Sequence, residues 1–238
     1  MQVVEARRKF GGYKREAPKA IRAPKVKENR ALAEAHRLYA DFYDGERGRR
    51  DDLARGACYE EFVHASRLLE GADMSAKTIT EFSITFDDCL LPEHKNKPHR
   101  YYEGIFISAM VKKAKEMDFV IHLTEDVRRI VGFIGYENEK NIRVYGDVGD
   151  SSFIRMSSGT VEILGHACGN LAEQMSGGRI VIHEDYWGHV SYCYIGHKMT
   201  GGEIRIKGKS NPQLELEPLV KRIEHGRVYY KGELIVDK

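Results

Sequence analysis

One short pattern occurs four times between residues 142 and 208, and this repeat limits the possible folds more than any other feature of the sequence. Each copy has two branched apolar residues separated by one variable residue, as in Ile142 and Val144. The later copies begin at Val161, Ile180 and Ile204, after steps of 19, 19 and 24 residues. A strand of about four residues cannot bury an apolar face alone, so successive copies must stack on one another.

Methionine and glycine keep the same spacing as the apolar pairs. Met156, Met175 and Met199 are each followed by a small turn that ends in glycine. Coils stacked about 4.8 Å apart would pair their backbones and align like residues inside. The pattern therefore predicts a parallel β-solenoid with glycines at corners that require a positive φ. The glycines and methionines assigned to this structural repeat are Gly146, Gly149, Met156, Gly159, Gly165, Gly169, Met175, Gly177, Gly178, Met199, Gly201, Gly202 and Gly208.

The repeat also predicts which side chains share a row. On the outside, Arg143 should lie beside Glu162 and form an ion pair. Val228 follows Ile204 by 24 residues, which suggests one more strand, and the longer third coil should bulge near residues 192–197. The methionines form one inward ladder, and the other two inward ladders are Ile142, Val161, Ile180 and Ile204, and Val144, Ile163, Ile182 and Ile206.

The spacing of glycine and methionine in residues 146–156, 158–165, 175–182 and 199–208 resembles the GXGXG repeat domain. That domain closes the large subunit of glutamate synthase and also forms one of the subunits of formylmethanofuran dehydrogenase. The resemblance covers about residues 130–208 and implies a right-handed parallel β-helix that scaffolds neighbouring domains, with flavin, iron–sulfur, tungsten or molybdenum chemistry elsewhere. The chain departs from that family in having fewer coils, in Glu184, where other coils have glycine, and in Phe153 and Ile154, where glycine is common.

The sequence divides into four zones of an α+β protein: a basic, flexible arm (1–28), an α-helical hairpin (29–75), a mixed α/β junction (76–130), and the GXGXG-type β-helix with a C-terminal cap (131–238). The hairpin is predicted from apolar residues three and four positions apart, the period of one helix face.

Within the junction, three elements are expected. The alternation of Phe82, Ile84 and Phe86 with polar residues predicts a half-buried strand. Residues 104–117 are typical of a buried helix that ends in lysines, and residues 119–123 of a strand. Thr124 is a plausible start for another helix.

The arm carries nine basic and three acidic residues, a local charge of +6 in a chain whose net charge is +2. A basic arm of this kind can bind nucleic acid, although a solvated tail is the interpretation we favour. The four cysteines form no CxxC pair, the N-terminus lacks the apolar core of a signal peptide, and no run is long enough to span a bilayer. We therefore expect a cytoplasmic protein that does not associate with membranes.

One group of residues has the composition of a metal site. His166 and Cys168 precede His183 and Asp185 by about one coil, and the register places Asp185 above His166 and Trp187 above Cys168. Imidazole, thiolate and carboxylate together suit a soft divalent metal. Corners of a solenoid are also polar because water reaches them, and no metal-binding spacing recurs, so we favour the structural interpretation. No catalytic residue and no cofactor is predicted.

These observations favour a non-catalytic scaffold or assembly subunit that presents a β-helix face to a partner protein or to a second copy of itself. The resemblance implies one alternative, an accessory subunit of a glutamate-synthase-like or formylmethanofuran-dehydrogenase-like oxidoreductase whose active site lies on another chain. Nucleic-acid binding through residues 1–28 is a second alternative.

Overall fold

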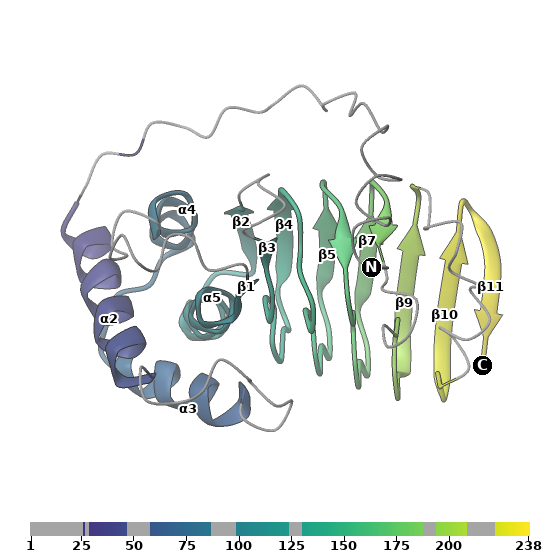
Figure 1. Ribbon diagram of the computed structural model, residues 1–238, viewed down its shortest axis with the longest axis horizontal. Coiled ribbons are helices and arrows are strands. Elements are labelled where there is room, and N and C mark those ends of the chain that lie inside the picture. Colours follow the sequence, from purple (N-terminus) through teal and green to yellow (C-terminus); the bar gives the residue numbers. More distant parts are fainter. Residues whose placement is uncertain are drawn as a thin grey trace, which may run out of the picture.

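Four helices are followed by a parallel β-solenoid of about four turns in the computed structural model (Figure 1). The structure describes residues 26, 29–46, 58–86, 99–123, 130–187, 194–208 and 222–238. The predicted basic arm falls outside this part of the chain except for Val26, as do the helix start proposed at Thr124 and the first two residues of the bulge proposed at residues 192–197. The helices lie at one end of the solenoid and the C-terminal hairpin at the other.

The predicted helical hairpin is confirmed by α2 (Arg30–Glu46) and α3 (Cys58–Leu68). The buried helix predicted over residues 104–117 is α5 (Tyr101–Lys113), which begins and ends earlier, with every residue from Glu103 to Val111 buried. Aromatic rings hold this end together: the ring of Phe106 lies 5.2 Å from Tyr39 and 5.6 Å from Phe42, centroid to centroid. Rings at such distances stabilise a core beyond the area that they bury.

The strand predicted around residues 82–86 is wrong, because this segment forms helix α4 (Ala76–Thr85). Ser75 caps the helix by accepting a hydrogen bond from the backbone N–H of Thr78. The buried apolar residues are Ile79, Phe82 and Phe86, at steps of three and four. Phe82 and Phe86 alone fit both the two-residue period of a strand and the period of a helix. The N-terminal cap at Ser75 favours the helix.

The main sheet contains seven strands in the spatial order β11-β10-β9-β7-β5-β4-β2, and all neighbours are parallel except β10 and β11. The predicted register is confirmed: Ile142 pairs with Val161, Val161 with Ile180, Ile180 with Ile204, and Ile204 with Val228. The strands are β2 (Asp118–His122), β4 (Asn141–Tyr145), β5 (Thr160–Ile163), β7 (Arg179–Ile182), β9 (Thr200–Ile206), β10 (His225–Tyr230) and β11 (Glu233–Asp237).

Strand β2 adds a coil that the repeat pattern did not reveal. Phe119 pairs with Ile142 in parallel, so the main sheet begins before residue 131. Helix α4 covers this first strand: the hydroxyl of Thr80 donates to the carbonyl of Val120, and the N–H of His122 donates to Ser83 Oγ. Bonds of this kind protect the edge of a sheet from pairing with another chain.

Two further sides close each coil. One side contains β1 (His99–Arg100), β3 (Ile130–Val131), β6 (Ala167–Cys168) and β8 (Tyr186–Trp187). Single parallel bridges join Val148 to Val131 and to Ala167 and so complete that side. The third side has the bridges Ser152 to Leu171 and Leu171 to Ile195. Met156, Met175 and Met199 are fully buried between these sides, as the methionine spacing predicted.

Among the described residues, no helix combines the length and the apolar composition that crossing a bilayer demands.

Candidate binding groove on the main sheet

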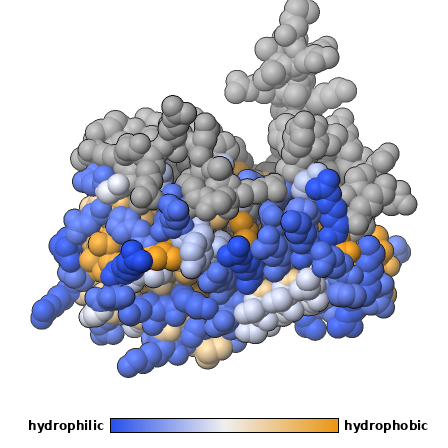
Figure 2. All heavy atoms as spheres, turned by 90° about the horizontal axis from the view of Figure 1, so that it is seen from below, coloured by the Kyte–Doolittle hydropathy of each residue, from blue (hydrophilic) through white to orange (hydrophobic). Residues whose placement is uncertain are grey.

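An open groove of about 500 Å³ runs along the edge of the solenoid at which the strands of the main sheet begin. One glycine from each of four successive coils lines it, and in each coil the residue after the glycine belongs to a strand of the main sheet. Figure 2 views this edge from below and shows a pale, weakly polar band between hydrophilic side chains. The lining residues are Gly159, Thr160, Gly178, Arg179, Gly202, Glu203, Gly226, Arg227, Asp237 and Lys238.

The residues that directly follow these four glycines form one outward row across the coils. In this row Thr160 pairs with Arg179, Arg179 with Glu203, and Glu203 with Arg227. Charges of opposite sign therefore alternate along the C-terminal half of the groove. This row was not predicted from the sequence, although Arg179 and Glu203 directly precede Ile180 and Ile204 of the first apolar ladder and Arg227 directly precedes Val228.

Glu203 is the centre of the charge arrangement. Its side chain is 6% exposed, and its carboxylate lies 3.0 Å from Arg179 Nε, 2.5 Å from Arg205 Nε and 3.6 Å from a terminal nitrogen of Arg227. The three arginine side chains are 53%, 40% and 54% exposed in that order. A single buried carboxylate thus orients three half-exposed guanidinium groups.

The arginines hold the pKa of Glu203 below its ordinary value. The largest cause is the hydrogen bond from Arg205, and the charges of Arg179 and Arg227 act in the same direction. Burial opposes them, because desolvation disfavours the charged form. The same hydrogen bond raises the pKa of Arg205, so both groups are charged at neutral pH.

A second row of outward side chains lies beside the groove. Arg143 donates to Glu162 and forms an ion pair with it at 2.8 Å, which confirms the predicted pairing. Arg205 lies over the ring of Tyr229, with its central carbon 4.3 Å from the ring centroid. A guanidinium at this distance from an aromatic face is attracted to it, so one face of Tyr229 is occupied.

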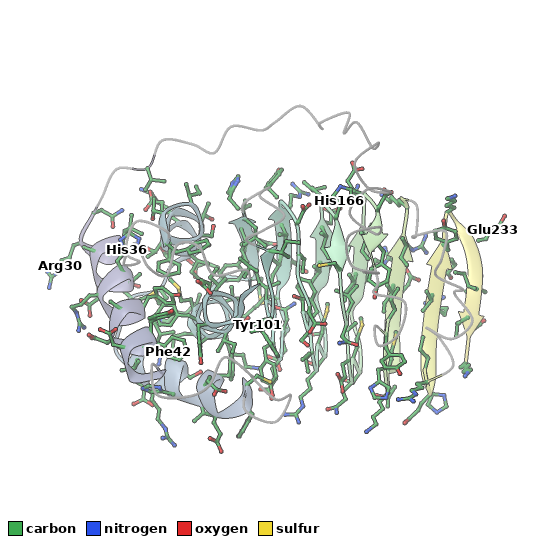
Figure 3. The ribbon with its side chains drawn as sticks, in the orientation of Figure 1. Arg30, His36, Phe42, Tyr101, His166 and Glu233 are labelled. Atoms are coloured by element: carbon green, nitrogen blue, oxygen red, sulfur yellow. The ribbon has the colours of Figure 1, made fainter. Side chains whose placement is uncertain are left out.

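The residues singled out as a possible metal group lie at the opposite end of the main-sheet strands, where Figure 3 shows His166. As the register predicted, Asp185 is stacked on His166: its backbone N–H donates to His166 Nδ1 at 3.1 Å. The N–H of His166 in turn donates to Asp147 Oδ1 at 2.9 Å. The strand register also places Trp187 next to Cys168. His166 therefore links one coil to the next.

His183 lies apart from that stack. It approaches Glu162, with Nε2 3.9 Å from a carboxylate oxygen, and burial together with the nearby charge of Lys207 lowers its pKa. In the described part of the chain, no cluster of three or more histidine, cysteine, aspartate or glutamate side chains is arranged to hold a metal ion.

Other polar corner residues bridge the coils in the same way as His166. Asp150 accepts hydrogen bonds from the backbone and side-chain N–H groups of Asn170, and Asn170 accepts one from the N–H of Tyr194. Asn141 accepts one from the N–H of Thr160. These side chains satisfy backbone groups that a corner would otherwise leave without a partner.

Comparison with known proteins identified no relative: no family model, no curated protein and no solved structure matches the chain.

Proposed function

We propose that this chain is a non-catalytic scaffold or assembly subunit that binds a partner protein along the groove of the main sheet. The observation that carries the proposal is the groove itself, an open cavity of about 500 Å³ with charged side chains held in place by the buried Glu203. A groove on rigid, stacked strands keeps its shape in the absence of a partner, which lowers the entropy lost on binding.

The use of the polar corner residues supports a structural role for the solenoid. His166, Asp147, Asp150 and Asn170 each accept a hydrogen bond from the next coil. Residues whose chemistry would suit catalysis or metal binding thus contribute to the stacking of the coils. This supports a chain whose outer face, and not a reaction centre, performs the function.

The GXGXG-type spacing supports a finer version of the same proposal. In the families that this spacing resembles, the β-helix scaffolds an oxidoreductase whose cofactors lie elsewhere, and this chain would serve as an accessory subunit of such an enzyme. Stable co-purification with a flavin or iron–sulfur protein would support this version.

The scaffold proposal is tested with the full chain purified from its own cells under gentle conditions. We expect a stoichiometric protein partner, or a second copy detected by sedimentation velocity. Thr160 is exposed and lines the groove, so Thr160→Trp should fill part of it and weaken the complex at least tenfold. The control is Lys207→Trp, an exposed position after β9 that does not line the groove. A chain that migrates alone, or a complex that Thr160→Trp leaves intact, would overturn the proposal.

A further inference from the structure

We propose that the groove binds an acidic, extended segment of the partner protein, with its carboxylates held by Arg179 and Arg227. This inference rests on the scaffold function proposed above and names the chemistry of the partner.

The charge balance around Glu203 favours an anionic occupant. One carboxylate lies within 4.0 Å of three guanidinium groups, which leaves a surplus of two positive charges. Within the described residues, Arg179 and Arg227 have no other carboxylate at this distance. The lining side chains themselves carry a net charge of +1, from Arg179, Arg227 and Lys238 against Glu203 and Asp237, and Arg205 lies just outside the lining.

The arginines have donors to spare. A guanidinium carries five N–H donors in a planar fork that fits a carboxylate with two parallel bonds. Arg179 contacts Glu203 through Nε, and Arg227 approaches it through one terminal nitrogen. About half of each side chain is exposed, so the remaining donors are open to a ligand.

The shape of the groove suits an extended peptide. Its four glycines come from successive coils, which are about 4.8 Å apart, so the floor is about 14 Å long. That length matches about four residues of extended chain at 3.4 Å each. The four glycines are partly exposed and carry no side chain, so the floor presents backbone to the ligand.

A nucleic acid fits this site less well than a peptide. Binding to DNA or RNA is dominated by many phosphate contacts, and a surplus of two charges supplies few of them. Single strands also need aromatic faces for base stacking, whereas Arg205 already covers one face of Tyr229. We therefore assign the groove to protein carboxylates.

The test is fluorescence polarisation with the full chain and a labelled hexaglutamate peptide capped at both ends. We expect hexaglutamate to bind at least tenfold more tightly than the matching hexaglutamine peptide. We also expect its affinity to fall as salt is added. The double variant Arg179→Gln/Arg227→Gln should lose at least tenfold in affinity. The double variant Arg179→Lys/Arg227→Lys keeps the charge but loses the planar fork, so its affinity should lie between those of the parent chain and the glutamine double variant.

Arg143→Gln is the matched control. Arg143 lies on the same sheet face, is 53% exposed and is paired with Glu162 outside the groove, so its loss should change affinity less than twofold. Circular dichroism and the melting temperature establish that each variant is folded.

The inference is wrong if the two peptides bind equally, if the double variant binds as well as the parent chain, or if a single-stranded oligonucleotide binds tenfold more tightly than hexaglutamate. These results leave the scaffold proposal intact when a co-purified partner is still lost with Thr160→Trp. Conversely, peptide binding without any natural partner would contradict the scaffold proposal alone.

Discussion

Met175 packs directly beneath Gly202 of the next coil: a Cβ added to Gly202 would lie 2.6 Å from the terminal methyl carbon of Met175. The same relationship joins Met156 to Gly178 and Met199 to Gly226, each also at 2.6 Å. Each methionine thus fills the space that the missing side chain of a glycine leaves one coil later. This contact explains why methionine and glycine recur with the same spacing in the sequence.

The first prediction concerns that contact. Gly202→Ala should lower the free energy of unfolding by about 2–4 kcal/mol, because the new Cβ meets Met175 and the carbonyl oxygen of Gly178 and because alanine is strained at a φ of 97°. The measurement is urea unfolding followed by circular dichroism. Gly232→Ala is the control, since its φ is 87° but no atom lies within 4 Å of the added Cβ.

The control should therefore report the backbone strain alone, about 1 kcal/mol. If Gly202→Ala lost no more stability than Gly232→Ala, the packing of Met175 beneath Gly202 would make no measurable contribution.

The second prediction tests the methionine side of the contact. Met175→Ala should lower the free energy of unfolding by about 2–5 kcal/mol, because Met175 is fully buried and the change leaves a cavity. Met175→Leu nearly conserves volume and should lose less than about 1.5 kcal/mol. Met117→Ala is the control, since that side chain is 51% exposed and should change stability by less than about 0.5 kcal/mol. Equal effects at Met175 and Met117 would contradict the buried ladder.

The solenoid could be predicted from the sequence because its coils repeat. A pairing between Ile142 and Val161 recurs as Val161 with Ile180 and again as Ile180 with Ile204, so each copy tests the others. The glycines were predicted for one reason only, a positive φ. At Gly201 the reason is different, because a Cβ there would collide with the carbonyl oxygen of Ser176 in the coil below.

Helix α4 and the groove could not be predicted in this way. Phe82 and Phe86, four residues apart, fit a strand and a helix alike, and the hydrogen bonds between α4 and β2 that favour the helix are tertiary. The groove depends on the distances from Glu203 to three arginines on three strands. The repeat predicts which positions share a row, but a row alone does not reveal which carboxylate a guanidinium will contact.

The third prediction concerns strain at another corner of the coils. Lys198 has a φ of 56° although it is not glycine, and its side chain is exposed. The left-handed conformation costs a non-glycine residue about 1–2 kcal/mol, and glycine avoids this cost. Glycine also loses more conformational freedom on folding, which offsets part of the gain. Lys198→Gly should therefore raise the free energy of unfolding by about 0.5–1 kcal/mol and the melting temperature by a few degrees.

Lys198→Ala separates backbone from side chain, since it removes the lysine but keeps the strain. Its free energy of unfolding should lie within about 0.5 kcal/mol of that of the parent chain. A stabilisation by alanine equal to that by glycine would show that the lysine side chain, and not the backbone, is unfavourable here.

The fourth prediction is a pH dependence at Glu203. Because its pKa in the folded chain lies below the ordinary value of 4.5, its charge stabilises the fold above that value and this contribution is lost as pH falls through the lowered pKa. Glu203→Gln should therefore lower the free energy of unfolding at pH 7 by about 1.5–3 kcal/mol, the range for hydrogen bonds to charged groups. At a pH where Glu203 is protonated in the parent chain, the difference should shrink, because both proteins then carry a neutral group. Urea unfolding at pH 7 and at successive values below 4.5 measures this.

Glu162→Gln serves as control, because its partly exposed ion pair with Arg143 should contribute less than about 1 kcal/mol at pH 7. A difference between Glu203→Gln and the parent chain that stays constant down to full protonation would show that the charge of Glu203 does not stabilise the fold.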